Sequence, residues 1–442
     1  MVMQTLSGLP WPTAAWATWS IAALATLGVI ARPFGWPEFI WATAGALLLV
    51  ALGLLSPALA LAGVEKGTDV YLFLVGMMLL AELAREGGLF EWLAARACAM
   101  AHGSPTRLFT LVFAVGTIVT AFLSNDATAV VLTPAVAAAA KAAKARDPLP
   151  YLFICAFTAN AASFVLPISN PANLVIYRSH MPSLLQWLPR YALPSILSIA
   201  ATYLVLRWTQ RNSLHQDIAS DIEVPTLSTG GKTAAIGIAA TAIVLLASSA
   251  AGIQLGLPTF LAGLATAALV MTRSNTGPLA IAPLTIAPLA TALNIATNIA
   301  WGVLPLVAGL FVLVEALEVT GVTRSLATLV QNLARHSANQ AGWIVGPVLA
   351  VGSNLVNNLP AGLVAGRVAE LADLPERVRA AILIGIDLGP NLSVTGSLAT
   401  ILWLTALRRE GVTCSARTFL KVGALVMPPA LLLAIASTVL VH

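Results

Sequence analysis

The stretch Leu123-Ser124-Asn125-Asp126-Ala127-Thr128-Ala129 interrupts a mainly apolar run that extends from Leu108 to Ala140. An aspartate in such a run is costly, because placing its charge at the middle of a bilayer costs about 2.5 kcal/mol or more. A charge kept there despite this cost indicates a functional site. A second polar interruption, Gly352-Ser353-Asn354-Leu355-Val356-Asn357-Asn358, lies at the corresponding place in the second half. We interpret the two stretches as the tips of re-entrant helical hairpins that face one substrate site.

The composition is typical of a polytopic helical membrane protein. Of the 442 residues, 58% are hydrophobic and 9% are charged, and the mean hydropathy is +0.88. A soluble domain of this length with so few charges would lack a solvated surface. The apolar runs are continuous and do not alternate with a period of two, so they predict helices rather than a β-barrel. The net charge of +5 fits the basic loops of an inner (plasma) membrane protein and implies no nucleic-acid partner.

Ten segments are long enough to cross about 30 Å of hydrocarbon at about 1.5 Å per residue. They are residues 13–31, 38–62, 68–85, 150–177, 184–207, 231–252, 256–272, 300–317, 378–407 and 418–441. Two longer stretches, 108–143 and 342–372, contain the polar tips and predict helix–tip–helix hairpins, because non-helical backbone at membrane depth must be covered by protein or water. For the proline-punctuated stretch 276–300, a surface loop and an extra insertion into the bilayer both stay open.

The two halves resemble each other in sequence. The segment 70–76, followed by Glu82 and Gly88, matches the segment 303–309, followed by Glu315 and Gly321, at a constant offset of 233 residues. We therefore predict two repeats, 1–209 and 233–442, joined by a cytoplasmic linker at 210–232. Each repeat would hold five spans and one hairpin. One of the five spans is broken, at 150–177 in the first repeat and at 378–407 in the second. An odd number of spans makes the second repeat inverted, which is a common transporter plan with the substrate site at the repeat interface.

Basic residues in short loops predict which side of the membrane faces the cytoplasm, because cytoplasmic loops carry an excess of lysine and arginine. The cluster that includes Arg85, Arg107 and Lys141 lies where the first hairpin enters and leaves. We assign this side to the cytoplasm. Both termini would then lie outside.

Polar residues gather in four places, namely the two hairpin tips and the two broken spans, where proline and glycine end the helices. Broken helices expose backbone N–H and C=O groups that can bind polar solutes inside the membrane. The candidate substrate-binding residues are Ser124, Asn125, Thr128, Ser169, Asn170, Asn173, Ser353, Asn354, Asn357, Asn358, Asn391, Ser393, Thr395, Gly396 and Ser397. Because this set contains no arginine or lysine, it suits a neutral polyhydroxylated solute, or a cation held by carbonyl groups, better than a carboxylate.

Asp126 and Asp387 are the two acidic residues near the middle of these broken elements. Burial favours the protonated form of a carboxyl group, so either residue can carry a proton through the transport cycle. We predict that one or both couple transport to proton flow. For Glu82 and Glu315, which lie near the ends of equivalent helices, an ion-paired interfacial role is favoured over coupling.

Features of an enzyme or of an ATP-driven pump are missing from the sequence. There is no Walker motif, no zinc-ligand spacing and no nucleophile–histidine pair at membrane depth, and the three cysteines are far apart. The sequence therefore predicts no enzyme activity, no cofactor and no metal site. A channel conflicts with the paired hairpins, although these do not exclude it.

Three motifs resemble those of the ArsB-type arsenite/antimonite efflux permeases of the Ion Transporter superfamily. They are Ser124-Asn125-Asp126-Ala127-Thr128-Ala129 with the following Val130 to Pro134, Asn357-Asn358-Leu359-Pro360, and the run from Gly389-Pro390-Asn391 to Trp403. The resemblance covers the chain from about Asp69 onward. Dicarboxylate carriers of the superfamily have threonine where this chain has Asp126, which argues against a carboxylate substrate.

The resemblance implies an elevator-type transporter that exports trivalent arsenic or antimony in exchange for protons. It also implies a scaffold that forms a homodimer and a permease that can pair with a separate ArsA-type ATPase. The alternative is a sodium/proton antiporter or an organic-anion (dicarboxylate or citrate) carrier of the same superfamily. Arsenous acid is a small neutral trihydroxide, so an asparagine, serine and threonine lining can hydrogen-bond it.

Overall fold

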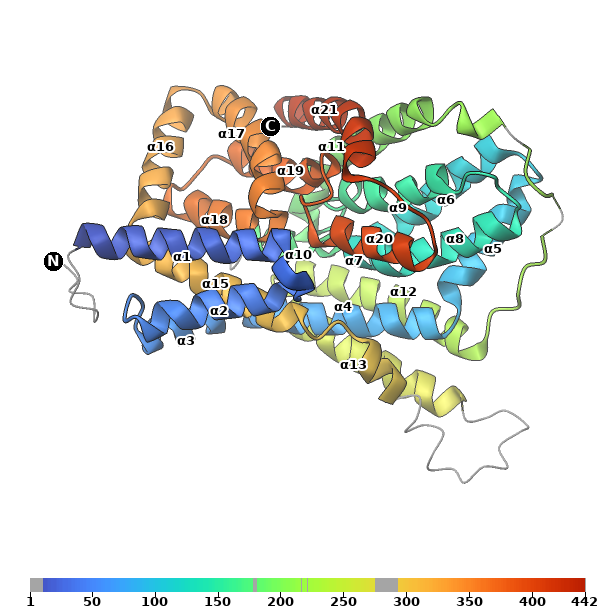
Figure 1. Cartoon of the computed structure of the whole chain (residues 1–442), viewed down its shortest axis with the longest axis horizontal. Coiled ribbons are helices and arrows are strands. Elements are labelled where there is room, and N and C mark those ends of the chain that lie inside the picture. The colour runs from blue at the N-terminus through green and yellow to red at the C-terminus, as the bar shows by residue number, and fades with distance from the viewer. Residues whose placement is uncertain (1–10, 178–180, 216, 221, 275–292, 442) are drawn as a thin grey trace.

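The computed structural model describes residues 11–177, 181–215, 217–220, 222–274 and 293–441, which fold into helices joined by loops (Figure 1). Within these ranges, six helices are long and apolar enough to cross a membrane, and two bent pairs of helices could each form a further span. The structure thus confirms an all-helical, polytopic membrane protein. Most of the stretch 276–300, whose placement the sequence left open, lies outside the described residues.

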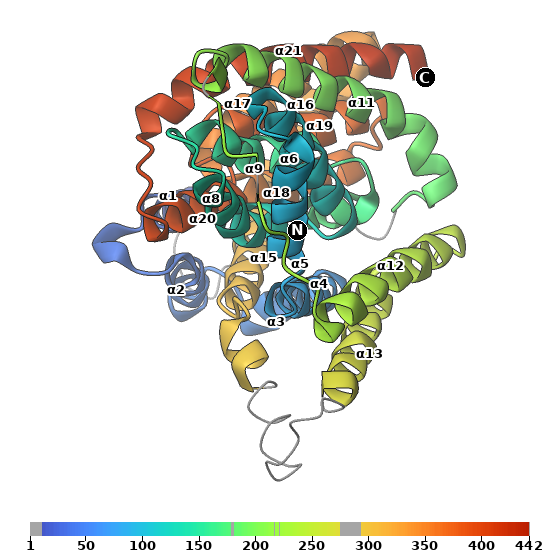
Figure 2. The same ribbon diagram turned by 90° about the vertical axis from the view of Figure 1, so that its right-hand side faces the viewer.

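The helices form two layers (Figure 2). One layer contains the hairpins and broken spans, crossed on its outer side by two long helices, α11 (Leu184–Thr209) and α21 (Ala416–Val441), which pack against each other. The other layer, which we call the scaffold layer, consists of α1 (Trp11–Ala31), α2 (Glu38–Ala51), α3 (Pro57–Glu65), α4 (Thr68–Glu86), α12 (Thr229–Ala250), α13 (Gly256–Ser274) and α15 (Val303–Val319).

The predicted continuous span 38–62 is wrong, because the chain leaves the helix after Ala51. Gly53 has a φ of +67°, a conformation that glycine adopts without steric cost. The Ser56 side chain then accepts a hydrogen bond from the Leu59 N–H, and Pro57 begins α3. Serine before proline is a helix-start signal. Helix α3 instead forms a bent pair with α4, at 47°.

The scaffold helices show the repeat that the sequence predicts. Helix α4 is followed by Gly88 with a φ of +74°, and α15 by Gly321 with a φ of +83°, so both equivalent glycines occupy the left-handed region. Helices of the two halves pack against each other, because α2 of the first half contacts α15 of the second, and α4 of the first half contacts α13 of the second. The repeat boundaries at 209 and 233 stay predictions, although the loop before α12 fits a linker.

The first hairpin consists of α6 (Pro105–Phe122), the short helix α7 (Asn125–Ala127), the π-helical turn η2 (Thr128–Leu132) and α8 (Thr133–Ala142). The hydroxyl oxygens of Thr120 and Thr128 are 2.8 Å apart. Eight residues of continuous helix would separate them by about 12 Å, so the chain turns back at the tip. The second hairpin consists of α17 (Ala338–Val356) and α18 (Asn358–Leu371), and Asn357 between them has a φ of +71°.

Both predicted broken spans are broken in the structure. The first consists of α9 (Leu149–Ala161), the turn η3 (Pro167–Ser169) and α10 (Pro171–Tyr177). The second consists of α19 (Glu376–Leu388), the turn η6 (Gly389–Asn391) and α20 (Leu398–Arg409). Pro167 begins η3, Pro171 begins α10 and Pro390 follows Gly389 in η6, and a proline cannot continue a helical hydrogen-bond ladder.

The hairpins lie toward opposite ends of the molecule and their tips point to its centre (Figure 1). Each hairpin follows a connecting helix, α5 (Leu89–Ala101) or α16 (Val322–His336). The second helix of each broken span packs against the hairpin of the other half. Helix α10 of the first half contacts α18, and α20 of the second half contacts α7, η2 and α8. The polar tips and breaks of the two halves are therefore gathered in one region.

Candidate substrate and proton site

The two broken spans meet where their first helices end. Leu149 and Ala161, the ends of α9, correspond to Glu376 and Leu388, the ends of α19, each 227 residues later. At this offset Asn160 corresponds to Asp387. Both are fully buried. The same position of the repeat thus carries an amide in the first half and a carboxyl group in the second half.

Asp387 accepts two hydrogen bonds from the first broken span. The Ser163 hydroxyl donates to its Oδ2 at 2.6 Å, and the Asn170 amide donates to its Oδ1 at 2.9 Å. Asn170 is fixed in turn, because its own Oδ1 accepts a hydrogen bond from the Ala172 N–H at 3.0 Å. A buried carboxyl group is thus held by donors from the opposite repeat, as a buried polar group requires.

Ser163 can serve both protonation states of Asp387. Its one hydroxyl hydrogen has two acceptors in reach, the Asn160 carbonyl at 2.7 Å and Asp387 Oδ2 at 2.6 Å. With Asp387 ionised, Ser163 donates to the carboxylate. With Asp387 protonated, the carboxyl group donates to Ser163, which then donates to Asn160. The site can therefore take up and release a proton while every group keeps a partner.

Asn160 likewise contacts two residues of the opposite repeat. Its amide donates to Asn391 Oδ1 at 3.0 Å, and its Oδ1 lies 3.5 Å from the Ser397 hydroxyl. Asn391 also donates to the Phe157 carbonyl at 3.2 Å. Asn170 and Ser397, which precede the second helix of each broken span, thus occupy equivalent roles toward Asp387 and Asn160.

The second hairpin tip is bonded to the break between α19 and α20. The Asn354 amide donates to the Gly389 carbonyl at 2.9 Å, and its Oδ1 accepts from the Ser393 hydroxyl at 2.7 Å. The Thr395 hydroxyl donates to the Asn354 carbonyl at 3.0 Å, and the Asn358 N–H donates to the Gly396 carbonyl at 2.8 Å. These five predicted residues of two elements are therefore brought together.

The first hairpin tip borders a cavity of about 100 Å³. Ser124 caps α7 by accepting from the Ala127 N–H, and Asn125 accepts from the Asp126 N–H at 2.9 Å. Within the described part of the chain, no hydrogen bond reaches the Asp126 carboxyl group, and Asp126 lines the cavity together with Ser124 and Glu82. Asp126 thus differs from Asp387, which is enclosed and doubly bonded.

The remaining predicted residues form hydrogen bonds within and between the hairpins and the breaks. Thr128 bonds to Thr120 between the hairpin arms. Ser169 donates to the Ala121 carbonyl of the first hairpin at 2.9 Å. Asn173 donates to three carbonyl groups of the break, Ser353 donates to the carbonyl one turn earlier, and Asn357 caps α18.

Asn160 and Ser163 were not among the candidate site residues, yet they are central to the hydrogen-bond network. Both lie in the polar interruption of the first broken span, of which only Ser169, Asn170 and Asn173 are among the candidates. Aligning the two breaks at an offset of 227 places Asn160 opposite Asp387, so the signal was present in the sequence. The partners across the repeats could not be inferred, because local spacing does not say which sides of two broken helices face each other.

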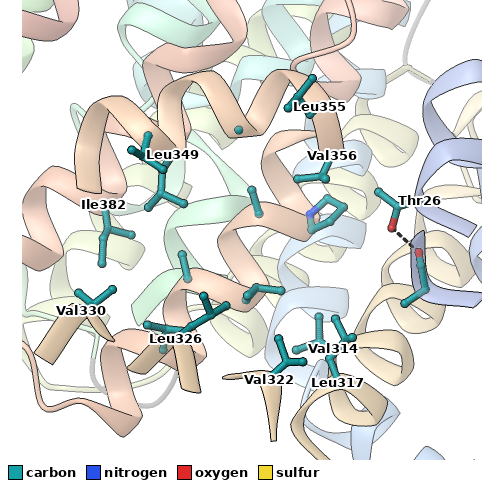
Figure 3. A pocket seen from close by; sticks show the side chains of 18 of the residues that line it. Thr26, Val314, Leu317, Val322, Leu326, Val330, Leu349, Leu355, Val356 and Ile382 are labelled. Carbon is teal, nitrogen blue, oxygen red and sulfur yellow. Dashed lines mark hydrogen bonds between the residues drawn. The ribbon is translucent and has the colours of Figure 1, made fainter. Parts of the chain in front are cut away.

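A much larger cavity, of about 1070 Å³, lies between α1, α15, α16 and the second hairpin. Its walls are aliphatic, as Leu326, Leu349, Leu355 and Ile382 illustrate (Figure 3). The Thr26 hydroxyl at its edge already donates to the Ala22 carbonyl. Burying a hydroxyl-rich solute there would leave its polar groups without partners. This apolar cavity is therefore a poor candidate for the site of a polar substrate, and the polar crossing is the better candidate.

We expect Gly396→Ala to destabilise the protein by about 1–3 kcal/mol, the usual cost of overpacking. A Cβ at this position would lie 2.5 Å from Pro390 Cα and 2.6 Å from Asn354 Oδ1. Thermal unfolding in detergent measures the effect as a lower midpoint temperature. Gly352→Ala, in α17 of the second hairpin, is the control, because its Cβ would meet nothing within 4 Å. Equal midpoints for both variants would contradict the close contact.

Paired hairpins and crossing broken helices with a buried polar site are typical of membrane transporters. The chain belongs to the citrate transporter family, whose profile matches residues 15–389. It is a multi-pass protein of the inner membrane.

Relatives within reach of sequence comparison are also transporters. The chain is 26% identical over 385 residues to a protein named arsenical pump membrane protein from Yersinia enterocolitica, covering 83% of this chain and 85% of the relative. A protein of the same name from Escherichia coli is 26% identical over 382 residues, with the same shares covered. An uncharacterized transporter of Mycobacterium tuberculosis is 25% identical over 374 residues, covering 83% and 84%. The resemblance inferred from the motifs is confirmed.

Two solved structures share the fold. The YdaH transporter of Alcanivorax borkumensis superposes with a TM-score of 0.56 at 17% identity, covering 91% of this chain and 96% of that one. MtrF of Neisseria gonorrhoeae, described as one of a class of antimetabolite efflux pumps, gives a TM-score of 0.50 at 13% identity, covering 96% and 94%. At these identities the likeness concerns the fold alone.

Proposed function

We propose that this chain exports trivalent arsenic and antimony, as arsenite and antimonite, in exchange for protons. The observation that carries the proposal is the buried crossing of Asp387 and Asn160 with the donors of the opposite repeat. It combines one carboxyl group with amides and hydroxyls that donate and accept hydrogen bonds. The relatives named arsenical pump membrane protein support the same substrate class.

The chemistry of the crossing suits a neutral trihydroxide. Arsenous acid presents three hydroxyl groups, each a donor and an acceptor, and amide and hydroxyl side chains satisfy both roles. Among the described residues that hydrogen-bond at the crossing, none is arginine or lysine. A citrate anion would need such positive charges, because burying unpaired carboxylates is expensive. The site therefore favours a neutral cargo, although the family is named for citrate.

Proton exchange is assigned to Asp387 and Asp126. Asp387 lies at the centre of the crossing, where Ser163 accommodates both of its protonation states. Asp126 lies at the edge of a cavity. The layer of hairpins and broken spans would move against the scaffold layer, and a protonated and a cargo-loaded form would cross in opposite directions.

The test is expression in an arsenic-sensitive host that lacks its own efflux system and any ArsA-type ATPase. We expect higher arsenite tolerance and less cell-associated arsenic than with an empty vector. Rescue in this host would show that the chain acts as a secondary transporter without the ATPase. Failure to rescue, together with sodium-dependent or citrate-dependent transport in vesicles, would instead support the sodium/proton antiporter or organic-anion carrier.

Cys155→Ser should leave arsenite tolerance unchanged, although trivalent arsenic binds thiols. Cys155 lies in α9 about one and a half turns before Asn160 and is fully buried. An exporter must release its cargo, and thiolate ligands would retain it. Tolerance is measured alongside the amount of protein in the membrane. Loss of tolerance at a normal protein level would contradict the thiol-independent site.

A further inference from the structure

We propose that Glu82 is the proton-transfer residue between Asp126 and the cytoplasm. The inference rests on the proposed function, proton-coupled export, and adds the path by which the proton leaves. Glu82 and Asp126 come from different layers, the scaffold helix α4 and the first hairpin tip, and both line the cavity of about 100 Å³. Sequence analysis favoured an interfacial role for Glu82, and the shared cavity adds a reason to assign it a part in coupling.

The cavity can hold water that connects the two carboxyl groups. A buried water needs about 10–15 Å³ of accessible space and two to four polar partners, and the cavity exceeds this volume. Polar side chains on its wall include Glu82, Ser124, Asp126 and Asn298. The transfer balances simply. An O–H bond of the protonated Asp126 breaks, water relays the proton, and an O–H bond forms on the Glu82 carboxylate.

Arg85 supplies the means of release. Glu82 is 7% exposed, and Arg85 binds both of its carboxylate oxygens, through Nε at 2.8 Å and Nη2 at 2.5 Å. Glu86 lies 3.6 Å from the same Nη2 and is a second partner for Arg85. When Glu82 gains a proton, Arg85 can turn to Glu86. Its return to Glu82 then favours the ionised form and expels the proton.

The location of this ion pair fits the direction of transport. Side chains of Arg85 and Glu86 are 38% and 39% exposed, so the chain of groups runs from the cavity to the surface. The excess of basic residues assigns this end of α4 to the cytoplasm. Among the described residues, Arg85 pairs with Glu82, Glu86 lies near Arg85, and Asp126 lines the same cavity as Glu82. Glu91 of α5 adds a more distant negative charge toward Arg85.

Glu315 provides a matched comparison within the same molecule. It occupies the equivalent position on α15, is 8% exposed and pairs with Lys66 at 2.5 Å. It is not among the residues that line the cavity beside Asp126. At the position equivalent to Asp126, 233 residues later, the second hairpin has Leu359. The transfer path is thus a property of the first repeat.

Inside-out membrane vesicles test the proposal with two measurements. The first is arsenite accumulation driven by a proton gradient. The second is exchange of labelled for unlabelled arsenite at equal pH, which needs only the cargo-loaded form to cross. We expect Glu82→Gln to reduce gradient-driven accumulation about tenfold or more, since a proton-transfer group is lost, and to leave exchange intact. Glu82→Asp should restore part of the accumulation, and Glu315→Gln should match the wild type in both assays.

The outcomes separate the inference from the proposed function. Wild-type vesicles that show neither accumulation nor exchange of arsenite would overturn the proposed function and, with it, this path. If the wild type works and Glu82→Gln loses both activities equally at normal abundance, Glu82 has a structural role. If the variant keeps both activities, the proton leaves by another route. Each of these last two results would overturn the inference alone.

Discussion

Asp387→Asn should abolish arsenite resistance, lowering transport by about 100-fold or more, because it removes a proton-binding group from the centre of the site. The fold should survive the change. Asparagine has nearly the shape of aspartate, its oxygen can still accept from Asn170, and its amide can donate to Ser163, which then donates to the Asn160 carbonyl. The variant therefore mimics the protonated state of Asp387 permanently.

A carrier fixed in the protonated state can neither release its proton nor exchange it for cargo. We therefore expect loss of gradient-driven accumulation and also of arsenite exchange at equal pH in inside-out vesicles. Asp373→Asn is the matched control, because the Asp373 side chain is fully exposed in the loop before α19. Normal exchange by Asp387→Asn would contradict a role at the cargo site, and normal accumulation would contradict a role in coupling.

Local sequence signals predicted the breaks in the two hairpins and in the two broken spans. A polar tip inside an apolar run indicated each hairpin, and proline or glycine indicated each broken span. The same kind of signal was overlooked in the predicted span 38–62, where Gly53, Ser56 and Pro57 end one helix and begin another. Breaks can be predicted because they depend on the backbone preferences of single residues.

Contacts across the repeats depend on the packing of segments far apart in the chain. The two halves align at an offset of 233 residues through α4 and α15 but at 227 through the broken spans. The offset of 233 that the sequence analysis used therefore does not pair Asn160 with Asp387. The hydrogen bonds of Ser163 and Asn170 to Asp387 emerge only when both breaks lie at one crossing. Hence the sequence could propose the two aspartates but could not distinguish their surroundings.

These surroundings predict a different result for Asp126→Asn. Asp126 lines a cavity beside the scaffold layer, away from the doubly bonded crossing of Asp387. We expect gradient-driven arsenite accumulation to fall by about 100-fold, because the group that would pass the proton toward Glu82 is lost. Arsenite exchange at equal pH should continue, since it requires no proton release. Inside-out vesicles measure both activities in one preparation.

Asp217→Asn, in the exposed loop between the halves, is the control for Asp126→Asn and should match the wild type. The comparison with Asp387→Asn then assigns the two roles. If Asp126→Asn loses exchange as well, Asp126 belongs to the cargo site and the separation of roles is wrong. If it keeps full accumulation while Asp387→Asn does not, Asp387 alone carries the proton. If Asp126→Asn loses accumulation alone and Asp387→Asn loses both accumulation and exchange, Asp387 belongs to the cargo site and Asp126 lies on the path of the proton.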